Sequence, residues 1–190
     1  MQRSVLHSLC TVVLFAVIAV LCAPAHAAAQ RWSWTYPAIQ KYGPVRPLPD
    51  AAVQPDKAHV YKAIFDVTSG SKDPAKPDPG LEHVARAVNV FVSAGVPLKN
   101  LKFVAVLHGP ATPASMNDAA YKAKYGVDNP NIPLFDALVK AGVKVDVCGQ
   151  ALADMHIHHA EVYRKKVDIV LSALSTVVIY GDEGYAYMKQ

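Results

Sequence analysis

The alternation of short apolar strand patterns with longer helical patterns constrains the fold of this chain most. Strand patterns rich in β-branched and aromatic residues are predicted at five places, over 59–67, 101–107, 143–148, 167–171 and 185–188. Segments with helical character separate or follow them, over 81–94, 113–125, 132–141, 151–165 and 173–180. Strands that alternate with helices imply an α/β fold, a three-layer α/β/α domain with a mainly parallel sheet of about five strands, flavodoxin-like in appearance.

Residues 1–27 have the pattern of a secretory signal peptide. Arg3 supplies a short positive region, an unbroken apolar run covers 11–21, and a small-x-small cleavage pattern ends at Ala27. The apolar run is short for a membrane span and no second run follows it, so we expect no stable membrane insertion. We therefore expect a periplasmic protein, with an uncleaved N-terminal anchor as the alternative.

Residues 28–56 differ in composition from the α/β domain that we predict over 57–190. They hold Trp32 and Trp34, the two tryptophans of the chain, together with several prolines. Closely spaced prolines exclude a helix or a central strand and favour an extended backbone. A free linker would not normally carry two tryptophans, so we expect this N-terminal arm to dock on its own domain or on a neighbouring subunit.

Removal of the leader changes both the cysteine content and the charge of the chain. Cys10 and Cys22 are lost, so Cys148 is left as a lone thiol that is buried, paired between molecules or chemically used. Without Arg3, the 19 lysines and arginines become 18 against 15 acidic residues, and the formal net charge falls from +4 to +3. This small and dispersed charge predicts no nucleic-acid partner.

The strand predicted over 143–148 places Cys148 at a carboxyl end, where open α/β sheets hold their ligands. A helix that begins just after Gly149 would point free N–H groups at the sulfur and favour the thiolate. Gly149 has no Cβ, so we expect a partner molecule to approach the backbone there, next to Gln150. Cys148 is thus a candidate nucleophile, and an ordinary buried cysteine is the alternative.

His108 follows the strand predicted over 101–107 and is expected at the same sheet edge as Cys148. Its imidazole could accept the thiol proton there or steady a charged substrate. Gly109, which follows it, is a candidate ligand-contacting position. The alternative is a polar strand end hydrogen-bonded to a loop carbonyl.

A cluster of histidines within the helix predicted over 151–165 suggests copper or zinc binding instead. His156 and His159 would share one helix face and form the plausible pair of metal ligands. Two ligands do not close a site without Asp154, Glu161 or another chain. A solvated, histidine-rich helix face is therefore the alternative.

Several short motifs in this order resemble the DsrE/DsrF-like family, at 106–110, 131–134, 138–145, 147–152, 172–178 and 184–187. The resemblance covers about residues 58–188. By contrast, the dinucleotide-binding fingerprint, the hydrolase nucleophile elbow and the zinc-protease motif are missing from the sequence, and we expect no cofactor.

The resemblance implies a small α/β/α homo-oligomer, commonly a trimer or hexamer. In family members that handle sulfur, a cysteine at the matching place accepts sulfane sulfur as a persulfide and passes it on, with other proteins as donor and acceptor. That role would fall on Cys148, supported by His108, in a sulfurtransferase-like carrier. Those members are typically cytoplasmic, whereas this chain carries an export signal. The alternative is a non-catalytic module that binds a metal or small ligand through His156 and His159.

Overall fold

Five parallel strands form the centre of the part of the chain that the structure describes, residues 33–190 of a computed structural model. The predicted signal peptide, 1–27, lies outside the described residues. The sheet order is β4-β3-β2-β1-β5, and every neighbouring pair is parallel, so the predicted α/β fold with a parallel sheet is confirmed. The strands are β1 (Tyr61–Val67), β2 (Leu101–Leu107), β3 (Lys144–Cys148), β4 (Asp168–Val170) and β5 (Ala186–Lys189).

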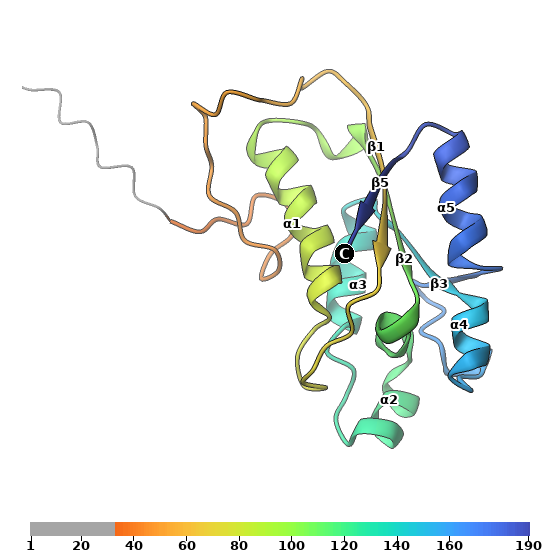
Figure 1. Ribbon diagram of the computed structural model, residues 1–190. Coiled ribbons are helices and arrows are strands. Elements are labelled where there is room, and N and C mark those ends of the chain that lie inside the picture. Colours follow the sequence, from red (N-terminus) through yellow and green to blue (C-terminus); the bar gives the residue numbers. More distant parts are fainter. Residues whose placement is uncertain (1–32) are drawn as a thin grey trace, which may run out of the picture. The chain divides into compact units, whose positions relative to one another are not determined.

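Helices cover both faces of this sheet (Figure 1). α1 (Pro79–Ser93) and α3 (Ile132–Lys140) pack on one face, and α4 (Gly149–Asp154) and α5 (Ala173–Asp182) lie on the other. The connections contain α2 (Asp118–Tyr125) and three 3-10 helices, Leu98–Asn100, Gly109–Ser115 and His159–Glu161. Within residues 33–190, no helix combines the length and the apolar character needed to cross a bilayer.

Successive side chains of each strand point to opposite faces of the sheet, as the period of two requires. On β1, Phe65 and Val67 join the large apolar core beneath α1 and α3, whereas Ile64 belongs to a smaller cluster beneath α5. On β3, Val147 joins the large core and Cys148 joins the smaller cluster. We call these two sides the core face and the α5 face.

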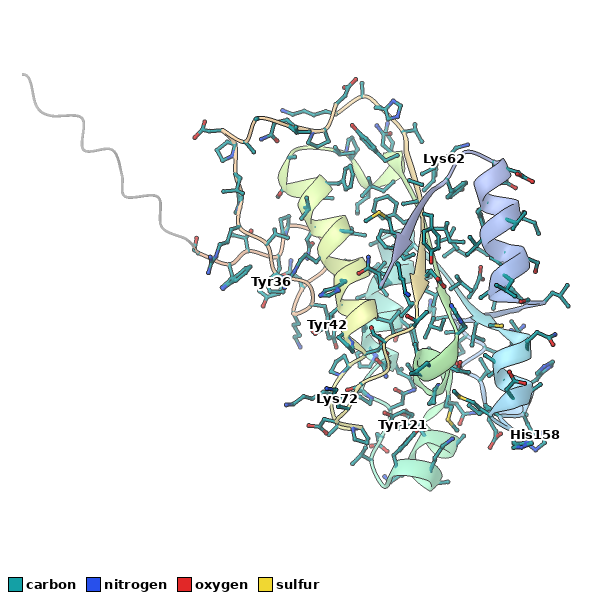
Figure 2. The ribbon with its side chains drawn as sticks, in the orientation of Figure 1. Tyr36, Tyr42, Lys62, Lys72, Tyr121 and His158 are labelled. Carbon is teal, nitrogen blue, oxygen red and sulfur yellow. The ribbon has the colours of Figure 1, made fainter. Side chains whose placement is uncertain are left out.

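The N-terminal arm docks on α1 of its own domain (Figure 2). Thr35 and Val45 exchange backbone hydrogen bonds of 2.8 and 3.0 Å, so the intervening chain folds back on itself. The buried side chain of Asn89, on α1, accepts hydrogen bonds from two N–H groups of this loop and donates to three of its carbonyls; the arm residues involved are Ala38, Ile39, Tyr42 and Gly43. Of the two docking places left open by the sequence, the described part of the arm therefore occupies its own domain.

Two of the predicted helices are wrong in extent. The helix predicted over 113–125 is a 3-10 turn followed by α2, which starts only after Asn117 caps it, because Met116 forms an antiparallel bridge with Val162. The helix predicted over 151–165 ends at Asp154, and His156 adopts a left-handed φ of 54° that a continuing helix cannot accommodate. The remaining helix and strand boundaries differ from the prediction by at most two residues, and both ends of β2 agree with it.

Candidate functional site

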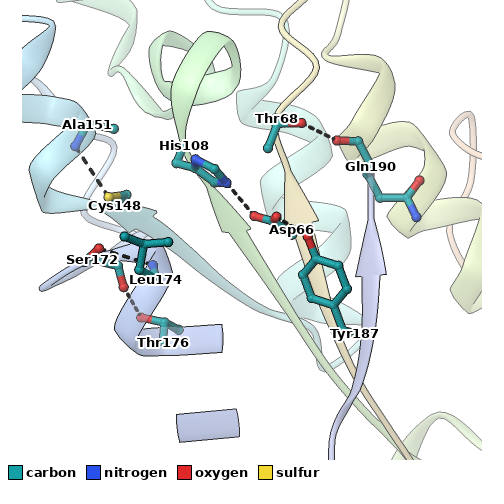
Figure 3. A network of polar contacts seen from close by, with 10 residues as sticks. All are labelled: Asp66, Thr68, His108, Cys148, Ala151, Ser172, Leu174, Thr176, Tyr187 and Gln190. Atoms are coloured by element: carbon teal, nitrogen blue, oxygen red, sulfur yellow. Dashed lines mark hydrogen bonds and ion pairs between the residues drawn. The ribbon is translucent and has the colours of Figure 1, made fainter. Parts of the chain in front are cut away.

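Cys148 ends β3 and directly precedes α4, as the sequence predicted. Its Sγ accepts the backbone N–H of Ala151 at 3.4 Å, so the thiol itself caps the amino-terminal end of this short helix (Figure 3). A hydrogen bond from an unpaired helical N–H stabilises negative charge on sulfur. The start of α4 therefore directs one of its free N–H groups at the Cys148 sulfur.

The thiol lies under an apolar cover on the α5 face. Only 5% of Cys148 is exposed, and it belongs to one cluster with Ala151, at the start of α4, and Ala173, the first residue of α5. Three strand residues complete this cluster from below, Ile64, Val104 and Val106. The first residues of α4 and α5 thus take part in covering the sulfur.

Gly149 serves packing within the chain. A Cβ on this residue would lie 2.9 Å from the backbone oxygen of Val170 and 3.4 Å from that of Leu171. The expectation that Gly149 leaves room for a partner molecule is therefore wrong, because the end of β4 fills that room. Gln150 donates its side-chain amide to the same Leu171 carbonyl at 3.3 Å, which ties the start of α4 to the chain after β4.

His108 hydrogen-bonds to a carboxylate, a partner that the sequence did not predict. Its Nε2 lies 2.5 Å from Oδ1 of Asp66, a residue of β1, and the other oxygen of Asp66 accepts the Tyr187 hydroxyl at 2.6 Å. Figure 3 shows these three side chains as one continuous network across neighbouring strands. Within residues 33–190, no hydrogen bond joins His108 to Cys148. The Asp66 carboxylate, and not the thiol, is thus the partner of this imidazole.

Gly109, beside this histidine, has a left-handed φ of 52°, and a Cβ there would meet nothing within 4 Å. Glycine is favoured at this position because the chain turns sharply from the end of β2 into the 3-10 helix. The open space around it is compatible with the predicted ligand contact.

The polar network opens into a hollow of about 390 Å³ on the α5 face. Asp66, His108 and Tyr187 form its polar end. Its apolar wall comes from α5, with Ala173, Leu174, Val177 and Val178. Since Ala173 also belongs to the cluster that holds Cys148, the hollow and the thiol are separated by the first turn of one helix.

The Asp66 carboxylate also acts on Tyr187. The pKa of Tyr187 is raised, chiefly because its hydroxyl donates a hydrogen bond to Asp66, and partial burial and the negative charge of Asp66 add to the effect. The phenol therefore stays protonated at neutral pH and remains a hydrogen-bond donor. Asp66 consequently keeps both of its oxygens occupied.

A second carboxylate of the same face is fully buried. Asp146 accepts a hydrogen bond from Lys144 at 2.9 Å through one oxygen, and its other oxygen has no partner among the described residues. Burial raises the pKa of Asp146, an effect that Lys144 opposes and Asp168 reinforces. A hollow of about 360 Å³ beside this pair is lined by the carboxyl-terminal half of α5.

Asp66 and Tyr187 were missed as site residues in the sequence. Asp66 interrupts an otherwise buried strand near its carboxyl end, which was a usable signal, since a charge in such a strand needs a partner. Tyr187 carried no such signal, because β5 pairs with β1 across more than a hundred residues of chain. Only the three-dimensional register Ile64↔Tyr187 places its ring beside the first strand.

The histidine cluster lies away from this network. His158 projects beyond the end of α4 (Figure 2), and its backbone N–H donates to Glu161 at 2.6 Å. His156 and His159 do not share a helix face, because α4 ends before both, so the spacing argument for a metal pair is wrong. Within residues 33–190, no three side chains of histidine, cysteine or acidic type are grouped so that they could hold a metal ion.

Comparisons with known proteins give one family and several solved structures with a similar fold. The sequence pattern of the DsrE/DsrF-like family matches residues 62–189. Among solved structures, the chain is similar to MTH1491, a protein of unknown function from Methanobacterium thermoautotrophicum, with 16% identity and a TM-score of 0.48. That likeness covers 68% of this chain and 99% of the other. No curated protein matches the sequence.

Proposed function

The chain belongs to the DsrE/DsrF-like family, and from this premise we propose that it is an exported carrier that accepts sulfane sulfur on Cys148. The observation that carries the proposal is the N–H group of Ala151, which points at the sulfur from the start of α4. Cysteine acts as a nucleophile in its anionic form, and a backbone N–H directed at the sulfur is a donor that such an anion requires. Cys148 also stands at the carboxyl edge of a parallel sheet, where α/β folds place reactive groups.

The proposed reaction is a simple displacement at sulfur. The Cys148 thiolate attacks the outer sulfur of a persulfide donor, R–S–SH, and a new S–S bond forms as the old one breaks. The donor leaves as R–S⁻ and takes up a proton, while Cys148 keeps the transferred sulfur as Cys148–S–SH. The transfer is neutral in oxidation state and needs neither a metal nor an external oxidant.

The burial of Cys148 sets a condition for this reaction. With 5% of the residue exposed, the donor reaches the sulfur only when the first turn of α5 moves away from α4. That turn is held by the Ser172 side chain, which accepts the N–H of Leu174 at 3.2 Å, while Leu174 itself is 81% exposed.

Intact mass after incubation with polysulfide tests the proposal. We expect the folded protein to gain one sulfur atom, the Cys148→Ser variant to gain none, and dithiothreitol to remove the added sulfur. Iodoacetamide labelling of the native protein is the parallel measurement. A folded chain that gains no sulfur, and whose Cys148 is alkylated only after unfolding, would rule out the carrier function.

Export and self-association belong to the same proposal. The predicted leader, 1–27, supports export, and N-terminal sequencing of protein from the periplasm should begin at or near Ala28. Self-association is supported by two large apolar side chains on the α5 face that are more than half exposed and do not line the hollow of about 390 Å³, Leu171 and Ile179. Light scattering should give a mass above one subunit, and Ile179→Ser should lower it. A wild-type monomer at micromolar concentration would contradict self-association.

A further inference from the structure

The hollow on the α5 face combines one polar end with one apolar wall. Its volume of about 390 Å³ is within the range of small-molecule sites, and the wall from α5 presents aliphatic side chains alone. The three polar side chains come from separate strands and converge at one end. Such a combination suits a ligand with an apolar body and one polar group.

The hydrogen bonds determine what the polar end can offer to a ligand. An ionised Asp66 carboxylate only accepts, so the proton in its hydrogen bond with His108 lies on Nε2 of the ring. A neutral imidazole with its proton on Nε2 has a lone pair on Nδ1. Among residues 33–190, no group hydrogen-bonds to that Nδ1, and 31% of the His108 side chain is exposed. The site therefore presents an oriented base, held by Asp66 and, through it, by Tyr187.

The strength of this base selects the ligand group. A thiol is acidic enough to give its proton to an imidazole, whereas an alcohol is far too weak an acid. The proton that arrives on Nδ1 creates an imidazolium next to Asp66, and the carboxylate stabilises that charge. The same carboxylate repels anionic ligands, and the aliphatic wall disfavours charged ones.

We propose that this hollow binds a small uncharged thiol and that His108 takes the thiol proton on Nδ1. The bound R–SH becomes R–S⁻, and His108 becomes an imidazolium paired with Asp66. Asp66 and Tyr187 act as positioning residues, because they touch the imidazole or the carboxylate and not the ligand's reacting atom.

The position of the hollow gives this thiolate a role beside Cys148. Both sites border Ala173, so an opening of the first turn of α5 would join them. The thiolate R–S⁻ then attacks the outer sulfur of Cys148–S–SH, and the S–S bond to Cys148 breaks as R–S–SH forms. Cys148 leaves as a thiolate, and the proton taken from R–SH stays on His108. This transfer step rests on the proposed persulfide, whereas binding and deprotonation of the thiol do not.

Benzyl mercaptan and benzyl alcohol are matched probes, since they differ mainly in the acidic group. Calorimetric titration into the full chain carrying Cys148→Ser should show the mercaptan bound about tenfold tighter than the alcohol. The ultraviolet band of the thiolate should appear on binding, at a pH where the free mercaptan is still protonated. His108→Gln should abolish the band and the preference, and His83→Gln, an exposed histidine outside the hollow, should change neither.

Tyr187→Phe provides the second variant, because it keeps the aromatic ring and removes only the hydrogen bond to Asp66. We expect it to bind the mercaptan and to shift the pH midpoint of the thiolate band, which a purely structural role of Tyr187 would not do. No binding, binding without the band, or a band that survives His108→Gln would overturn the inference. Binding that occurs only when Ile179→Ser has broken up an oligomer would also overturn it, since the hollow would then belong to the contact between copies.

The two proposals fail separately. If Cys148 takes up sulfur but the hollow binds no thiol, the inference about His108 is wrong and the carrier function stands. If the Cys148→Ser protein binds and deprotonates the mercaptan while the wild type never gains sulfur, the carrier function is wrong and the thiol site stands.

Discussion

The core face and the α5 face are built from the same strands but bury different kinds of side chain. Beneath α1 and α3 the layer is apolar, and large members such as Phe135 and Leu107 are fully buried. Beneath α5 the same strands carry Asp66, Asp146 and Cys148, and the covering helix leaves large apolar side chains in water. Alternation along a strand thus places the large apolar core on one face and the buried carboxylates and the thiol on the other.

The α5 face can hold charges because each has a partner. A buried carboxylate costs several kcal/mol unless it is paired or hydrogen-bonded. Asp66 accepts two hydrogen bonds, and Asp146 accepts one from Lys144. Among the described residues, the core face holds no comparable set of paired carboxylates beneath its helices. Its buried polar groups lie at the ends and on the outer side of those helices. Four substitutions test how far this division extends.

The largest effect should come from Phe135→Ala on the core face. Phe135 is fully buried, so truncation removes its transfer free energy and leaves a cavity, at a cost of about 3 to 5 kcal/mol. Leu174→Ala on the α5 face is the matched control, and its 81% exposure predicts a change within about 0.5 kcal/mol. Urea unfolding of both variants gives the comparison. Equal losses would mean that the α5 face carries as much stability as the core face.

The next largest effect on stability should come from Asp78, a buried carboxylate that caps α1 at the edge of the core face. Burial raises its pKa to about 6 from 3.8, against the opposing N–H groups of Leu81 and Gly80, and its Oδ2 has no partner. The folded state therefore binds the proton more tightly than the unfolded state, so stability falls as pH rises from about 4 to about 6. The full difference corresponds to about 3 kcal/mol.

Asp78→Asn should remove this pH dependence while its side-chain oxygen still caps the helix. Free energies of unfolding at pH 4 and pH 7, for the wild type and the variant, measure the effect. Asp73→Asn is the control, because this carboxylate is half-exposed and pairs with Lys76, outside α1. A variant whose stability changes with pH as the wild type's does would show that Asp78 is not the group that titrates.

The sequence predicted the framework of both faces but not the contacts between distant segments. Sequence pattern located the five described strands, because each one is a short run that contains β-branched or aromatic residues. It also located Cys148 at a strand end before a helix. It failed after Asp154, where the left-handed backbone of His156 depends on local packing that no periodicity records. It also failed for the Asp66–Tyr187 pair, since strand order decides that contact.

A smaller effect should follow from Asn89→Ala, which tests whether the arm stabilises the core face from outside. Asn89 makes five hydrogen bonds to the backbone of the arm, so truncation leaves those groups without partners or releases the loop. We expect a loss of about 2 to 3 kcal/mol and faster proteolysis near residues 38–43. Gln40→Ala is the control, because it removes one exposed hydrogen bond within the arm. Unchanged proteolysis would show that other contacts hold the arm.

The smallest effect on stability should come from Gly149→Ala, and it falls on the α5 face next to Cys148. The new Cβ would lie 2.9 Å from the Val170 carbonyl, so the start of α4 must move away from β4, at a cost of about 1 to 2 kcal/mol. That movement also displaces the Ala151 N–H from Sγ, so iodoacetamide should label the variant at a different rate from the wild type.

Gly181→Ala is a control that should change stability in the opposite direction. A Cβ at Gly181 meets nothing within 4 Å inside α5, and alanine there should stabilise the helix by about 0.5 to 1 kcal/mol. Suppose that Gly149→Ala destabilises the protein no more than Gly181→Ala does and leaves the labelling rate unchanged. The contact between α4 and β4 would then not position the thiol, and the reactivity of Cys148 would not depend on that packing.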